Sequence, residues 1–126
     1  MNVPDGLLYS ADHEWARREG NRVWIGITDY AQDALGDVVY VQVPAVGAVV
    51  AAGESFSEVE STKSVSDIYA PVAGTVVEVN ASLADHPEQV NAEPYGGGWL
   101  CVIEVTDPGE LDALLSAAAY RTLLEG

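Results

Sequence analysis

The chain has 126 residues, of which 48% are hydrophobic, and its 20 acidic residues against five basic ones give a formal net charge of −15. This length suits one compact domain with its own core, so we expect a single domain over residues 1–126. A surface this acidic repels phosphate backbones and argues against nucleic-acid binding. No apolar stretch is long enough to span a membrane, and the first residues lack the features of a secretory signal.

The single cysteine, Cys101, excludes a disulfide within the chain and fits a reducing compartment. We therefore expect a cytoplasmic protein, or a protein of the mitochondrial matrix from which a presequence has been removed. Because free cysteine behaves as a small core hydrophobe, we interpret Cys101 as a buried structural thiol.

In chain order, the first clear patterns are two stretches of alternating apolar residues, over 22–27 and 38–43, which predict strands. Each alternation predicts one buried face, formed by Val23, Ile25 and Ile27 in the first strand and by Val39, Val41 and Val43 in the second. The residues between them predict a short helix near 29–35. Asp29 can cap the start of this helix, and Gly36 can close its end.

The next segment predicts two strands joined by a turn. Gly53 and Gly74 each adjoin a pair of valines and lie at nearly equal distances on either side of Lys63. The residues 61–64 are small and polar, as in a turn. Strands leading out to this turn and back would bring the two glycines near each other and place Lys63 at the tip of a hairpin.

The last part of the chain predicts a segment that is mostly loop over 80–98, a strand over 99–105 and a C-terminal helix near 108–124. Asp107 followed by Pro108 is typical of a helix start. The whole pattern predicts a mostly β domain of short strands.

Lys63 is the only lysine in the chain, and the other four bases are arginines. A carrier domain needs one exposed amine at the end of a rigid protrusion, where an enzyme can acylate it and a long arm can reach other active sites. Because the other bases are arginines, whose guanidinium groups stay charged, no other side-chain amine competes with Lys63 for acylation. On this pattern alone, a carrier lysine and a solvated turn lysine without a role both stay open.

Four segments resemble, in order, the motifs of the glycine cleavage H-protein family, and together they cover nearly the whole chain from about residue 7. They are Tyr9–Trp15 with its His-Glu-Trp, Gly26–Asp37, Glu60–Gly74 around Lys63, and Asn91–Leu100 with its Asn-Ala-Glu-Pro-Tyr. The chain departs slightly from the common pattern beside the lysine, where Thr62 and Ser64 stand at positions that often hold apolar or small residues in the family. Both are small enough to admit an acylating enzyme.

The resemblance implies a barrel-sandwich hybrid of two antiparallel sheets, as in lipoyl and biotinyl carriers, with (R)-lipoate on Lys63 as N6-lipoyllysine. This swinging arm would accept an aminomethyl group from a pyridoxal-phosphate glycine decarboxylase. It would pass the group to a tetrahydrofolate-dependent aminomethyltransferase and be reoxidised by dihydrolipoyl dehydrogenase. A lipoate ligase, or a lipoyl or octanoyl transferase, would attach the arm. We thus expect a non-catalytic carrier, monomeric in solution, that serves glycine catabolism and one-carbon metabolism.

The resemblance also places Glu14 near the cleft of the arm, where its carboxylate is a candidate partner for the cationic methylamine. His13 and His86 are the only histidines, and nothing around them forms a set of metal ligands. No pairing of nucleophile and base is evident either. We therefore expect no metal site and no catalytic residue.

Other carriers fit less well. Lipoyl domains of 2-oxoacid dehydrogenases resemble this chain only around the lysine, and biotin carriers usually place methionine where Thr62 and Ser64 stand. Two alternatives stay open: a lipoyl relay protein that donates lipoate to other enzymes, and a non-carrier interaction domain in which Lys63 is unmodified.

Overall fold

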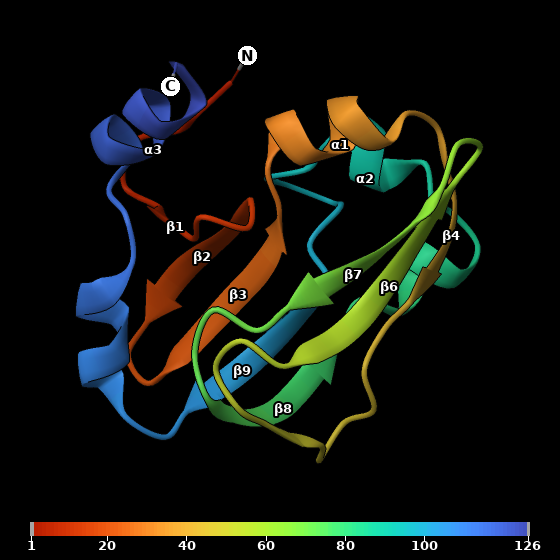
Figure 1. The fold of residues 1–126 in the computed structure, drawn as a ribbon. Helices are drawn as coiled ribbons and strands as arrows, with labels where there is room; N and C mark the ends of the chain where they lie inside the picture. Colours follow the sequence, from red (N-terminus) through yellow and green to blue (C-terminus); the bar gives the residue numbers. More distant parts are fainter. Residues whose placement is uncertain (1, 126) are drawn as a thin grey trace.

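The computed structural model describes residues 2–125, and two antiparallel sheets dominate it (Figure 1). The larger sheet has the strand order β1-β2-β3-β9-β8-β5 and the smaller one the order β4-β6-β7. The strands of the larger sheet are β1 Leu8–Tyr9, β2 Glu14–Glu19, β3 Arg22–Ile27, β5 Val49–Val50, β8 Gly74–Val79 and β9 Cys101–Val105. The strands of the smaller sheet are β4 Val38–Gln42, β6 Ser55–Ser61 and β7 Val65–Tyr69. This arrangement confirms the predicted fold class.

The hydrophobic core lies between the two sheets. The inward face of β3 consists of Val23, Ile25 and Ile27, as the alternation predicts, and all three are buried. Ile27 packs in one cluster with Val59 and Ile68 of the smaller sheet. Cys101 is also buried, and this burial raises the pKa of its thiol to about 12, which fits a structural role.

Strand β4 differs from its prediction. A β-bulge between Val38 and Tyr40 shifts its register against β6. Val38 and Val41 therefore point into the core, whereas Val39 is 53% exposed. The prediction that Val39, Val41 and Val43 share one face was wrong, because a bulge changes the alternation of side chains by one residue.

Helix α1 spans Asp29–Leu35, as predicted. Its N-cap is Thr28 and not Asp29, because the Thr28 hydroxyl accepts a hydrogen bond from the backbone N–H of Ala31 at 3.3 Å. Asp29 is the first helical residue, where a negative charge is favourable. Gly36 closes the helix with φ +81°, as expected.

The expected C-terminal helix near 108–124 is divided into two. The 3₁₀ helix η2, Pro108–Ala113, starts behind Asp107, and α3 spans Ala117–Glu125. Between them, Leu115 exchanges two backbone hydrogen bonds with Tyr9, at 2.7 and 2.8 Å. A continuous helix was the wrong prediction, because this pairing holds Leu115 in an extended conformation.

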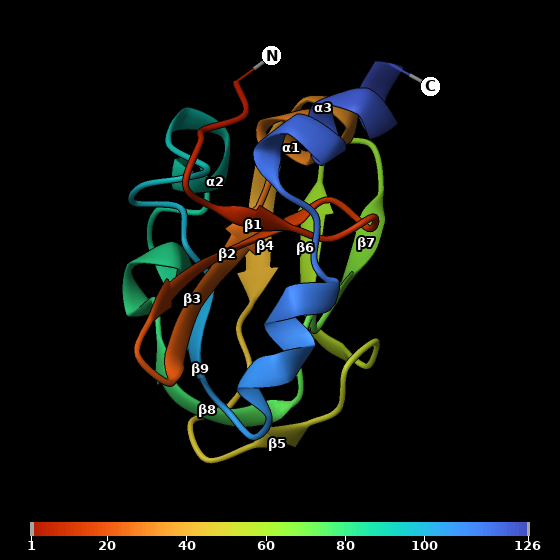
Figure 2. The ribbon, with the colours of Figure 1, turned by 90° about the vertical axis from the view of Figure 1, so that its left-hand side faces the viewer.

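The segment 80–98, expected to be mostly loop, contains the short 3₁₀ helix η1, Ala81–Ala84, and helix α2, Gln89–Ala92. Figures 1 and 2 place α2 beside α1. No helix within residues 2–125 has both the length and the apolar character that crossing a membrane requires.

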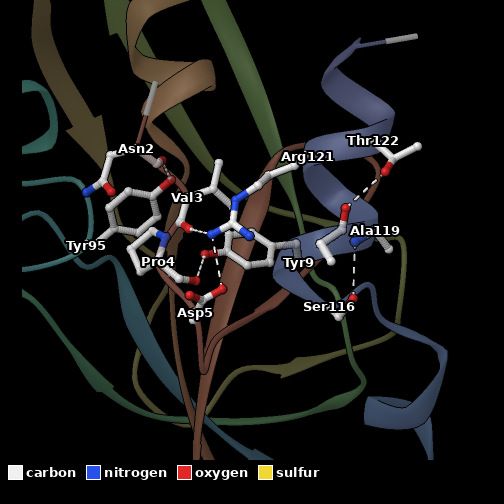
Figure 3. Close-up of polar contacts among 11 residues, drawn as sticks. Asn2, Val3, Pro4, Asp5, Tyr9, Tyr95, Ser116, Ala119, Arg121 and Thr122 are labelled. Carbon is white, nitrogen blue, oxygen red and sulfur yellow. Dashed lines mark hydrogen bonds and ion pairs between the residues drawn. The ribbon is translucent and has the colours of Figure 1, made fainter.

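Helix α3 packs against the N-terminal segment (Figure 3). The Arg121 guanidinium donates to the Val3 carbonyl at 2.7 Å and to the Asp5 carboxylate at 3.0 Å. Beneath it, the ring of Tyr120 stacks on that of Tyr9, with 4.7 Å between the ring centroids. The N-terminal segment and α3 therefore lie together, near β1 (Figures 1 and 2).

Candidate functional site

Lys63 lies in the turn between β6 and β7, at the tip of an extended hairpin (Figure 1). The antiparallel pairing of the two strands continues up to the turn, and the lysine is exposed. The predicted hairpin is thus confirmed. The residue opposite Gly74 in the larger sheet is Val50, three residues before Gly53.

Hydrogen bonds fix the backbone of the turn. The Ser61 hydroxyl oxygen accepts from the backbone N–H groups of Lys63 and Ser64, both at 3.1 Å. The Ser61 N–H donates to the Ser64 carbonyl at 2.8 Å, and the Thr62 N–H donates to the Asp37 carbonyl at 3.0 Å. The backbone that carries Lys63 is therefore held from within the turn and from the segment after α1.

The stem of the Lys63 side chain lies over Gly36. A Cβ atom at position 36 would lie 3.3 Å from Cε and 3.5 Å from Cδ of Lys63. The backbone of Gly36, with φ +81° and ψ −158°, is in a region that glycine occupies far more readily than other residues. The backbone at the end of α1 therefore favours glycine at position 36, and the absence of a side chain there leaves room for the lysine stem.

A pocket of about 260 Å³ starts beside the tip and runs along α1. Its lining comes from β7, from α1 and from the segments at the start of β2 and the end of β3. The lining residues are Asp12, His13, Ile27, Tyr30, Ala31, Ala34, Leu35, Ser64, Ser66, Asp67 and Ile68. Apolar side chains form most of the pocket, and carboxylates and hydroxyls are also present, so it suits a hydrocarbon chain with a polar end.

Sequence reasoning missed most of this pocket. One signal could have located its β7 side: Ser64, Ser66 and Ile68 alternate and so share the face of the hairpin that lines the pocket. Asp12 and Asp67, which are both lining residues, could not be assigned to a common site from sequence, because they belong to segments far apart in the chain.

Glu14 is buried, with 2% of its surface exposed, on the same face of β2 as the core residue Ala16. Its Oε1 atom accepts a hydrogen bond from the Ser10 hydroxyl at 2.5 Å. Burial raises the pKa of the Glu14 carboxyl to about 7. Glu14 does not line the pocket itself but follows His13, which does, at the end away from Lys63.

His13 forms the far wall of the pocket together with Tyr30, and 4.5 Å separates the two ring centroids. Its Nδ1 atom is 2.7 Å from the Tyr120 hydroxyl of α3, and its backbone adopts φ +71°. Burial lowers the pKa of the imidazole below its ordinary value, which favours the neutral ring. His86 is exposed and lies beside Glu88, and residues 2–125 hold no cluster that could bind a metal ion.

The arginines lie away from the lysine. Arg17, Arg18 and Arg22 flank the turn between β2 and β3, at the opposite end of the molecule from Lys63 (Figures 1 and 2). Arg121 lies on α3 and is bound to the N-terminal segment. The lysine turn is therefore distinguished from the rest of the surface by its position and by its amine.

Residues 7–126 match the family model described as Glycine cleavage H-protein. The chain belongs to the glycine cleavage H-protein family. It is 54% identical over 125 residues to the glycine cleavage system H protein of Anaeromyxobacter sp. (strain K), and the match covers 99% of this chain and 98% of the relative. It is 56% identical over 125 residues to a glycine cleavage system H protein of Thermus thermophilus, with 99% of this chain and 98% of the relative covered.

Structural comparison agrees with this membership. The crystal structure of a glycine cleavage system H protein from Mycobacterium marinum matches with a TM-score of 0.89 and 45% sequence identity, and the match covers 98% of this chain and 100% of that one. The predicted family and the barrel-sandwich fold are confirmed. As a member of this family, the chain is a lipoyl carrier subunit of the glycine cleavage system and not one of its enzymes.

Proposed function

We propose that Lys63 carries the lipoyl group, (R)-lipoate, as an amide on its Nζ atom, and that the chain acts as one carrier domain. The observation that carries this proposal is the position of the single lysine, which is exposed at the tip of a hydrogen-bonded turn and beside an apolar pocket. When bound, the lipoyl group supplies a disulfide that takes up and releases an aminomethyl group. The protein supplies the position, the pocket and the surface that its partner enzymes bind.

The lining of the pocket fits such an arm. Ile27, Leu35 and Ile68 offer an apolar wall to a hydrocarbon chain, and Asp12, beside His13, is an acidic lining residue at the end where a cationic group would lie. The pocket extends from the hairpin tip along α1 to His13, so a chain attached at Lys63 would enter it at one end. These residues would shield a loaded arm from water.

The proposed partners are the pyridoxal-phosphate glycine decarboxylase, the aminomethyltransferase, dihydrolipoyl dehydrogenase and the lipoate ligase or lipoyl or octanoyl transferase that loads the arm. The formal charge of −15 supports brief encounters with basic surfaces, which are fast and weaken as salt is added. We expect the carrier to meet each enzyme in turn as a monomer.

The test is the intact mass of the protein from a host that makes lipoate, followed by mapping of the modified peptide. We expect one lipoyl-sized increment, confined to the peptide that contains Lys63. An unmodified protein, despite an active ligase and supplied lipoate, would contradict the proposal, and so would an increment on any other peptide.

We extend the proposal to Glu14 as the group that neutralises the cationic end of the loaded arm. Its support is a buried carboxyl with a pKa of about 7, next to the pocket wall at His13. Such a group is uncharged for part of the time at neutral pH and loses its proton when a cation approaches, because the opposite charge lowers its pKa. The negative charge of Glu14 would then attract the cationic end of the folded-back arm to this end of the pocket.

Replacing Glu14 by glutamine is expected to speed the release of ammonia from the aminomethyl-loaded protein by about tenfold, since losing about 1.4 kcal/mol of charge stabilisation changes a rate tenfold. The measurement is the rate of ammonia release in the absence of the aminomethyltransferase. Glu60→Gln is the matched control, because it removes the same charge near the lysine from a residue outside the pocket. Equal rates in Glu14→Gln and the unsubstituted protein would contradict this role.

A further inference from the structure

Asn91, on α2, holds the segment that follows α1. Its Oδ1 atom accepts a hydrogen bond from the backbone N–H of Val38 at 2.8 Å. Its Nδ2 atom donates to the Gly36 carbonyl at 2.8 Å and to Oε1 of Gln32 at 3.0 Å. Both donors and one acceptor of the amide are used, so the side chain links the last turn of α1 to the start of β4.

The hairpin tip rests on this same segment. The carbonyl of Asp37, between the two residues whose backbones Asn91 binds, accepts the hydrogen bond from the Thr62 N–H at 3.0 Å. Gly36, whose carbonyl Asn91 binds, lies beneath the stem of Lys63. Through these two contacts, the position of the segment 36–38 therefore influences the position of the turn that contains Lys63.

We propose that Asn91 is a positioning residue for the acylation of Lys63. It acts through Gly36 and Asp37, and it holds the hairpin tip in the orientation that the acylating enzyme binds. The inference rests on the proposed function, because it concerns the step that attaches the lipoyl group. In this step Nζ of Lys63 forms an amide bond to the acyl carbon of an acyl adenylate and gives up a proton, while the bond from that carbon to phosphate breaks and AMP leaves.

The expected kinetic signature follows from the population of tip orientations. Without the Asn91 amide, the segment 36–38 and the hairpin tip sample other arrangements. The acylating enzyme then binds only the fraction of molecules in which the tip has the orientation that it recognises. The apparent KM then rises by the reciprocal of this fraction, whereas kcat at saturation is unchanged. A general loss of stability would leave KM unchanged as long as the protein remains folded.

The test compares Asn91→Ala and Asn91→Asp with Asn80→Ala in the full-length, unmodified protein. Asn91→Asp keeps the acceptor for Val38 but loses both donors. Asn80 is a matched control, because its Nδ2 atom also donates to two carbonyls, those of Gly97 and Trp99, both at 2.8 Å. Two quantities are measured: hydrogen exchange of the Thr62 amide, and KM and kcat for acylation by a lipoate ligase supplied with lipoate and ATP.

We expect Asn91→Ala to raise KM for the carrier by about tenfold with kcat within about twofold, and to speed exchange at Thr62. We expect Asn91→Asp to change KM and the exchange at Thr62 in the same direction. This variant tests the inference if Asn91→Ala does not fold. Unchanged KM and unchanged Thr62 exchange in a folded Asn91 variant would overturn the inference. An equal rise of KM in Asn80→Ala would also overturn it, since any lost amide would then have the same effect. Absence of acylation in the unsubstituted protein would overturn the proposed function itself.

Discussion

Replacing Lys63 by arginine is expected to abolish lipoyl loading completely, and with it all aminomethyl transfer through this protein. A guanidinium remains protonated and cannot attack an activated acyl group, and the chain has no second lysine to take its place. Because the side chain is exposed and its charge is kept, the free energy of unfolding is expected to change by no more than about 0.5 kcal/mol. Intact mass, glycine decarboxylation in the reconstituted system and urea unfolding measure the three quantities.

A second variant tests whether the position of the lysine matters for loading, or only the presence of an amine. Arg22→Lys, combined with Lys63→Arg, moves the only lysine to an exposed residue beside the turn between β2 and β3. We expect this double variant to stay unmodified, because that turn offers neither the Gly36 support nor the pocket. Loading at position 22 would show that any exposed turn lysine suffices, and it would contradict the role that we assign to the hairpin tip.

Replacing Glu14 by glutamine is expected to change how stability depends on pH. Burial raises the pKa of this carboxyl from 4.5 to about 7, a difference that corresponds to about 3 kcal/mol. Between these pH values the folded protein binds the proton and the unfolded chain does not. The contribution of Glu14 to the free energy of unfolding is therefore fully present below about pH 4.5 and is lost as the pH rises to about 7.

Glutamine is uncharged at every pH and can still accept the hydrogen bond from Ser10, so this loss disappears in Glu14→Gln. At pH 8 we expect the variant to be more stable than the unsubstituted protein by up to about 3 kcal/mol, with the difference falling toward zero at pH 4.5. Urea unfolding across this range measures the difference, in which the titration of the other carboxylates cancels. A difference in stability that does not vary with pH would show that burial does not raise the pKa of Glu14.

Local patterns in the amino-acid sequence were sufficient to predict an element where its two faces meet different surroundings. The alternation over 22–27 predicted a buried face on β3, and the small polar residues around Lys63 predicted the turn that presents it. The single lysine among four arginines made Lys63 the candidate for acylation from composition alone. These signals are visible in sequence because side-chain periodicity and turn propensity depend on residues close together in the chain.

Only the tertiary structure decided the features that depend on distant contacts. The C-terminal helix is interrupted because Leu115 pairs with Tyr9, and periodicity cannot reveal a partner so far away in sequence. The pocket likewise combines β7, α1 and the start of β2, and Asn91 reaches the lysine turn only through Gly36 and Asp37. The sequence by itself determined the family, most of the strands and the residue that we propose is acylated. Packing between distant segments decided what the lysine turn lies against and which groups surround the pocket beside it, because periodicity shows which residues share a face but not what that face meets.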